Sequence, residues 1–226
     1  KGRIKPDYKL KAGDLVRIPP IRRAVAEAEK DYRFISVIEH IIHEDDLMMA
    51  INKPAGLAVH GGSGLTGGLI EALRAHRVDL PYLELAHRLD RDTSGILVFA
   101  KNVNAKRFLQ EGWQEFKKTY LAVVKGTLQE KEGVITSYLV EGKTFNVHSS
   151  QNPNYGKKAI TNYKVLQKNK AYSLLKVNLE TGRKNQIRVH MQDIGHCIVG
   201  DKKYGASGSP LKRLGLHAQQ ISFIHP

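Results

Sequence analysis

The segment from residue 133 to residue 181 constrains the fold more than any other part of the chain, because nearly all of it has the pattern of β-strands. Runs rich in β-branched and aromatic residues predict strands at 134–140, 159–166 and 172–179, separated by polar loops such as 151–154. Many strands with few regularly interposed helices favour the α+β class over a doubly wound parallel sheet.

Shorter patterns predict the remaining elements. Helices are expected at 69–76 and at 102–116, and a third helix begins within 181–191 and stops at Gly195. Strands are expected at 38–43, 47–52, 57–59, 96–101, 118–126 and 216–224. In the strand 118–126, Tyr120 should share a face with Ala122 and Val124, because side chains alternate along a strand. The glycine-rich stretch 61–68 matches neither common phosphate-binding motif, so we interpret it as a flexible loop.

The first twenty residues contain a basic tail, a turn at Gly13, one short strand at 15–18 and a stop at two prolines. A single strand cannot fold alone. We therefore expect residues 1–20 to be the close of a preceding domain, 21–33 to be a charged linker, and 34–226 to form the main domain, with a truncated C-terminus.

The charge of the chain points to a polyanionic partner. Thirty-six Lys and Arg residues against twenty-two Asp and Glu give a net charge of +14. Nucleic acid fits better than a membrane, because no stretch reaches the roughly 18–20 apolar residues of a membrane span. Cys197 is the only cysteine, which excludes an intrachain disulfide and fits a cytoplasmic protein. We expect no metal, since zinc-type His/Cys spacing is absent from the sequence.

A charged turn at 86–95 leads directly into the apolar run 96–100. In this turn Asp90 lies between Arg88 and Arg91, and Gly95 frees the backbone. One interpretation is a solvated turn whose ion pairs contribute roughly 0–1 kcal/mol. The other is a carboxylate held in its ionised form for chemistry.

Three motifs, met in this order, resemble those of the RluA-type pseudouridine synthases, which isomerise uridine in ribosomal and transfer RNA. They are His87-Arg88-Leu89-Asp90, Lys118-Thr119-Tyr120, and Thr181-Gly182-Arg183 with Gln186-Ile187-Arg188-Val189-His190. The resemblance covers residues 34–226. Within the family the chain is similar to the large-subunit rRNA enzymes that carry an S4-like RNA-binding domain in front, because residues 9–14 resemble the close of such a domain.

The resemblance assigns three catalytic residues: Asp90, Tyr120 and Arg188. Asp90 can attack carbon covalently, steady a cationic sugar or act as a base. Arg188 would pair with Asp90 and keep it ionised, and its fork can bind both carboxylate oxygens. Tyr120 can stack on uracil and take part in proton transfer. Without the resemblance, an exposed helix arginine and a tyrosine packed in a sheet are the ordinary alternatives.

Further residues receive binding or supporting roles. Arg88 would fill the gap left by the flipped target base, and we assign Arg183 and Lys184 to RNA binding, although Lys184-Asn185 departs from the Thr-His common in relatives. Lys53 and Pro54 resemble the family's first motif, which supports the loop that carries Asp90 rather than performing chemistry. His87 and His190 are expected to be packing or hydrogen-bonding groups, and Asp92 a turn cap.

The fold implied is a largely antiparallel mixed sheet with flanking helices, split by a cleft with the Asp90 loop on one side and Arg188 on the other. The function implied is that of a monomeric, cofactor-free RNA pseudouridine synthase, with large-subunit rRNA as the expected substrate. Two alternatives stay open: a non-catalytic RNA-binding ribosome-assembly factor of the same fold, and a glycosylase that releases uracil. The target uridine is read partly from RNA shape and is not predicted.

Overall fold

The computed structural model describes residues 8, 9, 11, 13, 36–61, 67–142, 146–205 and 209–226. The chain divides into two units, Lys1–Lys30 and Asp31–Pro226. Apart from four isolated positions, the expected S4-like remnant at 1–20 and the linker at 21–33 lie outside the described residues, as does most of the glycine-rich stretch 61–68. The elements below all belong to the second unit.

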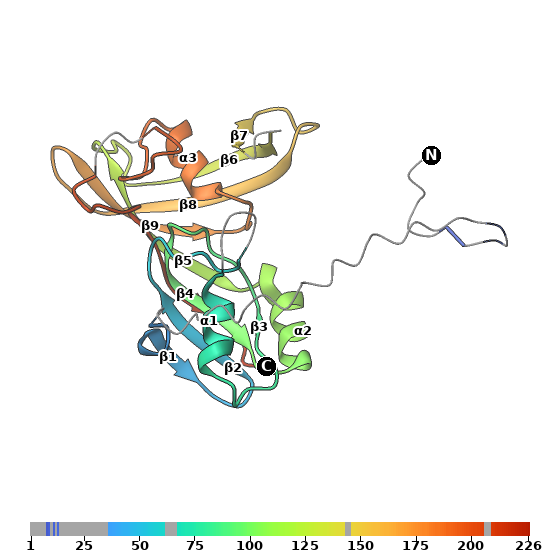
Figure 1. The fold of residues 1–226 in the computed structure, drawn as a ribbon. Coiled ribbons are helices and arrows are strands. Elements are labelled where there is room, and N and C mark those ends of the chain that lie inside the picture. The colour runs from blue at the N-terminus through green and yellow to red at the C-terminus, as the bar shows by residue number, and fades with distance from the viewer. Residues whose placement is uncertain are drawn as a thin grey trace. The chain divides into compact units, whose positions relative to one another are not determined.

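A ten-stranded mixed sheet forms the second unit and confirms the α+β class (Figure 1). Its order is β1-β2-β4-β10-β5-β9-β8-β6-β7, with β3 also paired to β4. Neighbouring strands are antiparallel except for the parallel pair β4 and β10. The strands are β1 Ile41–Glu44, β2 Met48–Lys53, β3 Glu84–Leu85, β4 Ser94–Ala100, β5 Lys117–Lys125, β6 Glu132–Glu141, β7 Val147–Ser150, β8 Lys157–Lys168, β9 Tyr172–Leu179 and β10 Leu216–Ser222.

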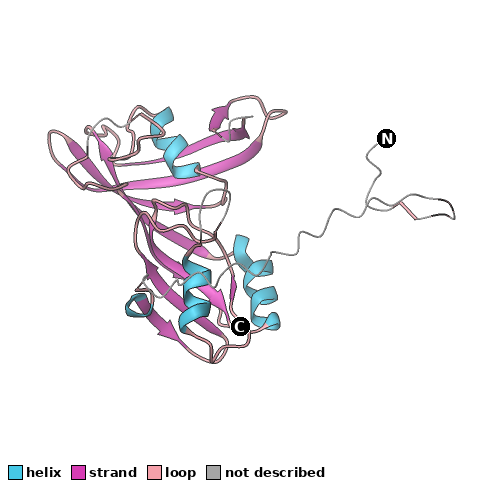
Figure 2. Cartoon of the chain, in the orientation of Figure 1, coloured by secondary structure: helices cyan, strands magenta, loops and turns pink. Residues whose placement is uncertain are grey.

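Three α-helices are present in the described part of the chain (Figure 2). They are α1 Leu69–His76, α2 Val103–Glu111 and α3 Gln186–Asp193, and short 3-10 turns occur at Ile38–His40 and Gly112–Gln114. The bounds of α1 agree with the prediction. Asn102 caps α2, its side-chain oxygen accepting a hydrogen bond from Ala105 N at 2.8 Å.

Strands β2 and β4 are buried on both faces. Met49, Ile51, Leu97 and Phe99 pack in one cluster with α1, whereas the alternating residues of the same strands pack in a second cluster with α2. Burial on both faces explains why these strands read as continuous apolar runs in the sequence rather than as alternating ones.

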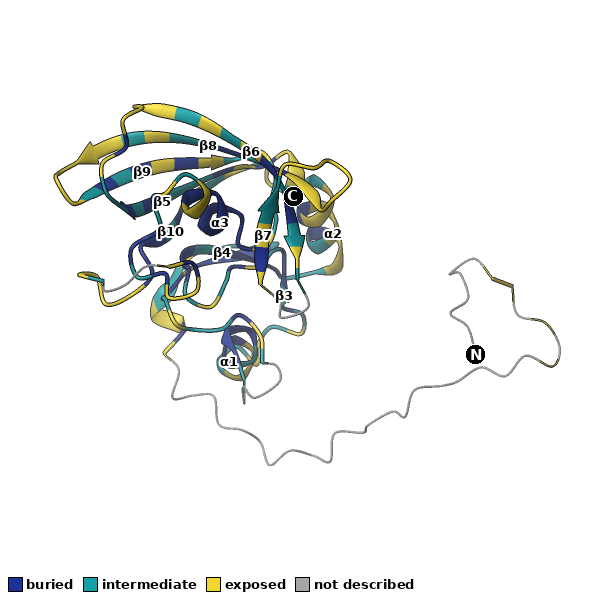
Figure 3. Ribbon diagram, turned by 90° about the horizontal axis from the view of Figure 1, so that it is seen from above, coloured by how far each residue is buried: buried dark blue, intermediate teal, exposed yellow. Residues whose placement is uncertain are grey.

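Helix α3 packs against the other half of the sheet, through Ile187 and Met191 on β5 and β9. Its residues from Gln186 to Met191 are all buried, and Figure 3 shows this part of the helix in dark blue. Tyr120 of β5 packs against both the α1 cluster and the α3 cluster. It shares the second cluster with Ala122 and Val124, as the alternation predicted.

Local structure departs from the predictions at several places. The first half of the expected strand 38–43 is the 3-10 turn Ile38–His40, and strand β3 was not predicted. The expected strand at 57–59 does not form, because the carbonyls of Ala58 and Val59 accept the first backbone N–H groups of α1, at 2.9 and 3.2 Å. The expected helix 102–116 ends at Glu111 and continues as a 3-10 turn. Strand β7 was missed, since only Val147 in it is a strong strand former.

Candidate active site

The loop between β3 and β4 carries Asp90 to the edge of a cleft of about 1140 Å³. Leu89 anchors the loop in the α1 cluster, and Thr93 N donates to the Asp90 carbonyl at 3.1 Å. Gly95 is the second residue of β4; its φ is +113°, and a Cβ there would come within 2.2 Å of the Ala218 carbonyl oxygen. Only glycine therefore allows β4 to lie this close to β10 directly after the loop.

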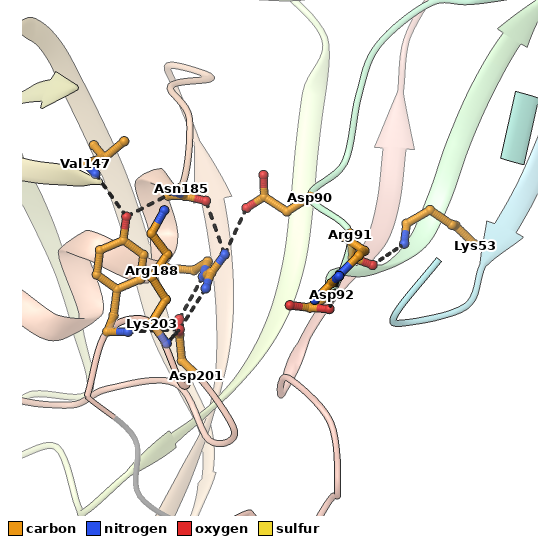
Figure 4. Close-up of polar contacts among 10 residues, drawn as sticks. Lys53, Asp90, Arg91, Asp92, Val147, Asn185, Arg188, Asp201 and Lys203 are labelled. Atoms are coloured by element: carbon orange, nitrogen blue, oxygen red, sulfur yellow. Dashed lines mark hydrogen bonds and ion pairs between the residues drawn. The ribbon is translucent and has the colours of Figure 1, made fainter. Parts of the chain in front are cut away.

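Lys53 holds the Asp90 loop in place. Its side chain is fully buried, and its ammonium donates to the carbonyls of Pro54, Leu57 and Arg91 at 2.8, 2.9 and 2.8 Å. Figure 4 shows the contact with Arg91. Burial lowers the pKa of Lys53 to about 8, against the opposite effect of Asp92 and Asp90. The bond to Arg91, next to Asp90, confirms that Lys53 supports this loop.

Arg188 reaches Asp90 from α3, on the other side of the cleft. Its Nη1 lies 3.4 Å from Asp90 Oδ2, and the arginine side chain is 9% exposed against 35% for the aspartate. Although burial acts to lower it, the carboxylates of Asp201 and Asp90 raise the pKa of Arg188. The expected contact between Arg188 and Asp90 is therefore present.

The expectation that the arginine fork binds both oxygens of Asp90 was wrong. Asp201 occupies the fork: Arg188 Nε lies 2.7 Å from its Oδ2 and Nη2 lies 2.8 Å from its Oδ1. Nη1 is the nitrogen that contacts Asp90, and it also donates to Asn185 Oδ1 at 3.2 Å. The sequence analysis missed Asp201 because it lies in a stretch interpreted only as a loop. The available signal was its acidic side chain, which follows the apolar pair Ile198-Val199 closely.

Tyr120 lines the same cleft as Asp90 and Arg188. Burial, together with the nearby charge of Asp90, raises the pKa of Tyr120 to about 12. The side chain is therefore a neutral phenol across the physiological range, with a ring that can stack and a hydroxyl that can donate a hydrogen bond.

Both histidines of the motifs are structural, as predicted. His87 Nε2 accepts a hydrogen bond from Val98 N at 3.1 Å, and its ring stacks on Trp113 with the centroids 4.1 Å apart. Burial lowers the pKa of His87 to about 3, so the ring is neutral at physiological pH. His190 is fully buried and hydrogen-bonds to Ser137 and Thr161.

The residues predicted to bind RNA line the cleft, but two of them also have protein partners. Arg88 is exposed. Arg183 Nε donates to the Lys158 carbonyl at 3.0 Å, and Lys184 pairs with Glu141. Arg91 and Asp92, the two residues that follow Asp90, form an ion pair with each other, with Arg91 Nε 3.2 Å from Asp92 Oδ1.

Among the described residues, no group of three His, Cys, Asp or Glu side chains is arranged to hold a metal ion. None of the helices described is long and apolar enough to cross a membrane.

The sheet and its cleft define a known class of protein. The fold matches the solved structure of human RNA Pseudouridylate Synthase Domain Containing 4 with a TM-score of 0.69 and 26% identity, over 84% of this chain and 87% of that one. Human RNA Pseudouridylate Synthase Domain Containing 1 matches with a TM-score of 0.68 and 26% identity, over 80% and 76% of the two chains. The fold is thus that of the pseudouridine synthases.

The family model described as RNA pseudouridylate synthase matches residues 47–193, and the chain belongs to this family. Over its whole length it is 46% identical to Ribosomal large subunit pseudouridine synthase C of Vibrio parahaemolyticus and 43% identical to the protein of the same name from Escherichia coli strain K12. The chain covers 76% of each relative. These findings confirm the resemblance and the assignment as an RNA pseudouridine synthase, an isomerase.

Proposed function

We propose that this synthase converts uridine to pseudouridine in large-subunit ribosomal RNA, with Asp90 as its catalytic residue. The observation that carries the proposal is the placement of Asp90: a partly exposed carboxylate at the cleft, with Arg188 at 3.4 Å and Tyr120 in the same lining. The substrate class is supported by the names of relatives that share 43–46% identity over the whole chain.

The reaction requires a group like Asp90. The bond from N1 of uracil to C1′ of the ribose breaks, the base turns, and a bond from C5 to C1′ forms, while C5 loses a proton and N1 gains one. No atoms are added or lost overall. A carboxylate can attack C1′ or stabilise a cationic sugar, as in glycoside hydrolysis, and it can also act as a base.

Arg188 and Tyr120 complete the catalytic group. The guanidinium contacts one oxygen of the Asp90 carboxylate at 3.4 Å and orients it, because the arginine is buried and held on α3. The ring of Tyr120 offers a stacking surface for uracil. Its neutral hydroxyl can take part in the proton transfer at C5.

The cleft suits a nucleotide that has left its stack. Its volume of about 1140 Å³ exceeds the range of about 300–1,000 Å³ typical of small-molecule pockets, so neighbouring nucleotides fit beside the target. Arg88 occupies the gap left by the flipped base, whereas Arg183 and Lys184 contact the RNA backbone. In this proposal the enzyme acts as a cytoplasmic monomer.

An isosteric substitution tests the role of Asp90. We expect Asp90→Asn to abolish release of tritium from RNA labelled at uracil C5 and to leave rRNA unmodified in cells that lack the native protein, while RNA affinity changes less than about threefold. The matched control is Asp92→Asn, two residues away and paired with exposed Arg91, which should keep full activity. Full modification by Asp90→Asn would overturn the proposal.

The same experiment separates the alternative functions. An RNA-binding assembly factor would leave the pseudouridine content of rRNA unchanged whether or not the protein is present. A glycosylase would release free uracil from the labelled RNA, which an isomerase does not.

A further inference from the structure

Arg188 has a second, closer carboxylate partner that cannot touch the substrate. The side chain of Asp201 is fully buried, with 0% exposed, and it accepts two hydrogen bonds from Arg188 at 2.7 and 2.8 Å. Asp201 is not among the residues that line the cleft. Any effect it has on the reaction must therefore be indirect.

The backbone fixes the position of the Asp201 carboxylate. Its Oδ1 also accepts the backbone N–H groups of Lys203 and Tyr204, both at 3.1 Å. The turn begins at Gly200, where φ is +77° and a Cβ would lie 2.1 Å from the Arg213 carbonyl oxygen. The carboxylate is thus set by the fold of this turn, independently of Asp90.

The turn also encloses the guanidinium. The ring of Tyr204 lies 5.1 Å from Arg188 Cζ, and its hydroxyl accepts hydrogen bonds from Asn185 Nδ2 at 3.0 Å and from Val147 N at 3.3 Å. Asn185, which has a positive φ of 55°, accepts in turn from Arg188 Nη1. Figure 4 shows Arg188 held among these groups and reaching towards Asp90.

The arrangement decides how Arg188 meets Asp90. A guanidinium free to turn would present two parallel N–H groups to a carboxylate, which is its preferred geometry. That contact would cover both oxygens of Asp90. Because Asp201 takes Nε and Nη2, Asp90 receives one contact from Nη1, at 3.4 Å.

We propose that Asp201 is a positioning residue, which holds Arg188 so that Asp90 is paired through one oxygen and keeps the other open to the substrate. This inference rests on the proposed catalytic role of Asp90. A misplacement of about 1 Å at a reacting group can cost about 100-fold in rate, and we expect a loss of that order when Asp201 no longer holds the fork.

The test is single-turnover kinetics on a stem-loop RNA, with the dissociation constant measured separately. Asp201→Asn should lower the rate of the chemical step about 100-fold and change the RNA dissociation constant less than about threefold. In the Arg188→Ala background the same substitution should cost no further rate. The control is Asp193→Asn, an exposed position on the same helix, which should react at the normal rate.

A second variant guards against misfolding. Asp201→Glu keeps the charge but moves the carboxylate one methylene towards the arginine, so we expect it to slow the reaction as well. A folded Asp201→Glu protein with the normal rate would overturn the inference, and so would an equal loss from Asp201→Asn with and without Arg188. If Asp90→Asn proves active, the proposed function itself fails; if Asp90→Asn is inactive and both Asp201 variants react normally, only the positioning role fails.

Discussion

Replacing Lys53 by methionine should destabilise the protein and displace the Asp90 loop. Three hydrogen bonds from a charged donor contribute about 1.5–3 kcal/mol each, or roughly 4.5–9 kcal/mol together. Burial of the Lys53 ammonium opposes these bonds. It lowers the pKa of Lys53 from 10.5 to about 8, which corresponds to a destabilisation of about 3 kcal/mol. The net loss expected for Lys53→Met is therefore about 1.5–6 kcal/mol, and three buried carbonyl groups lose their partner.

Thermal and chemical denaturation measure this loss. At about 2–4 °C for each kcal/mol in a domain of this size, the melting temperature should fall by roughly 3–24 °C. The rate of pseudouridine formation should fall about 100-fold through movement of Asp90. The control is Lys117→Met at an exposed position in β5, which should change the free energy of unfolding by less than about 0.5 kcal/mol.

The pH dependence gives an independent check. Between pH 8 and 10.5 the unfolded chain retains the proton on Lys53 that the folded protein releases, so the unfolded state binds more protons. The free energy of unfolding contributed by this site must then rise as pH increases through that window, and the burial penalty is fully present below pH 8. Lys53→Met should lose this rise. A variant as stable as the wild type at pH 7, with the same pH profile, would refute the reasoning.

Two further predictions follow from the site. Tyr120→Phe keeps the ring and removes the hydroxyl, so RNA affinity should be preserved while the single-turnover rate falls about 100-fold or more; a rate within twofold of normal would exclude the hydroxyl from proton transfer. Gly95→Ala places a Cβ 2.2 Å from the Ala218 carbonyl oxygen at a φ of +113°, so denaturation should show a loss of more than about 3 kcal/mol. Its control, Gly182→Ala, has open space around the new methyl group and should be tolerated; equal stability of the two alanine variants would contradict the account.

Local patterns were enough for most of the secondary structure. Helix α1 has its predicted bounds, and the cap of α2, Asn102, is the first residue of the helix predicted there, because caps and helical periodicity depend on residues within a few positions of one another. The segment 57–59 shows the limit of such patterns. Its apolar composition suits a strand, but its carbonyl groups are taken by the start of α1 rather than by a strand.

The candidate site was predicted in part. The motifs placed Asp90, Tyr120 and Arg188 together, and the structure brings all three to one cleft. Their catalytic roles stay predictions. The interpretation of Lys53 as a support for the loop came from the resemblance to the family, whereas the three carbonyl groups it binds became visible only in the fold.

The sequence by itself determined the α+β class, the family and the residues that meet at the cleft, because strand alternation, caps and motifs are written in short stretches of chain. Only the tertiary structure decided which carboxylate occupies the fork of Arg188. Asp90 lies 98 residues away from it and Asp201 lies 13 away. The choice between the two carboxylates depends on the turn that fixes Asp201 and on the 3.4 Å that separates Arg188 Nη1 from Asp90 Oδ2. The residues next to Arg188 in the sequence encode neither.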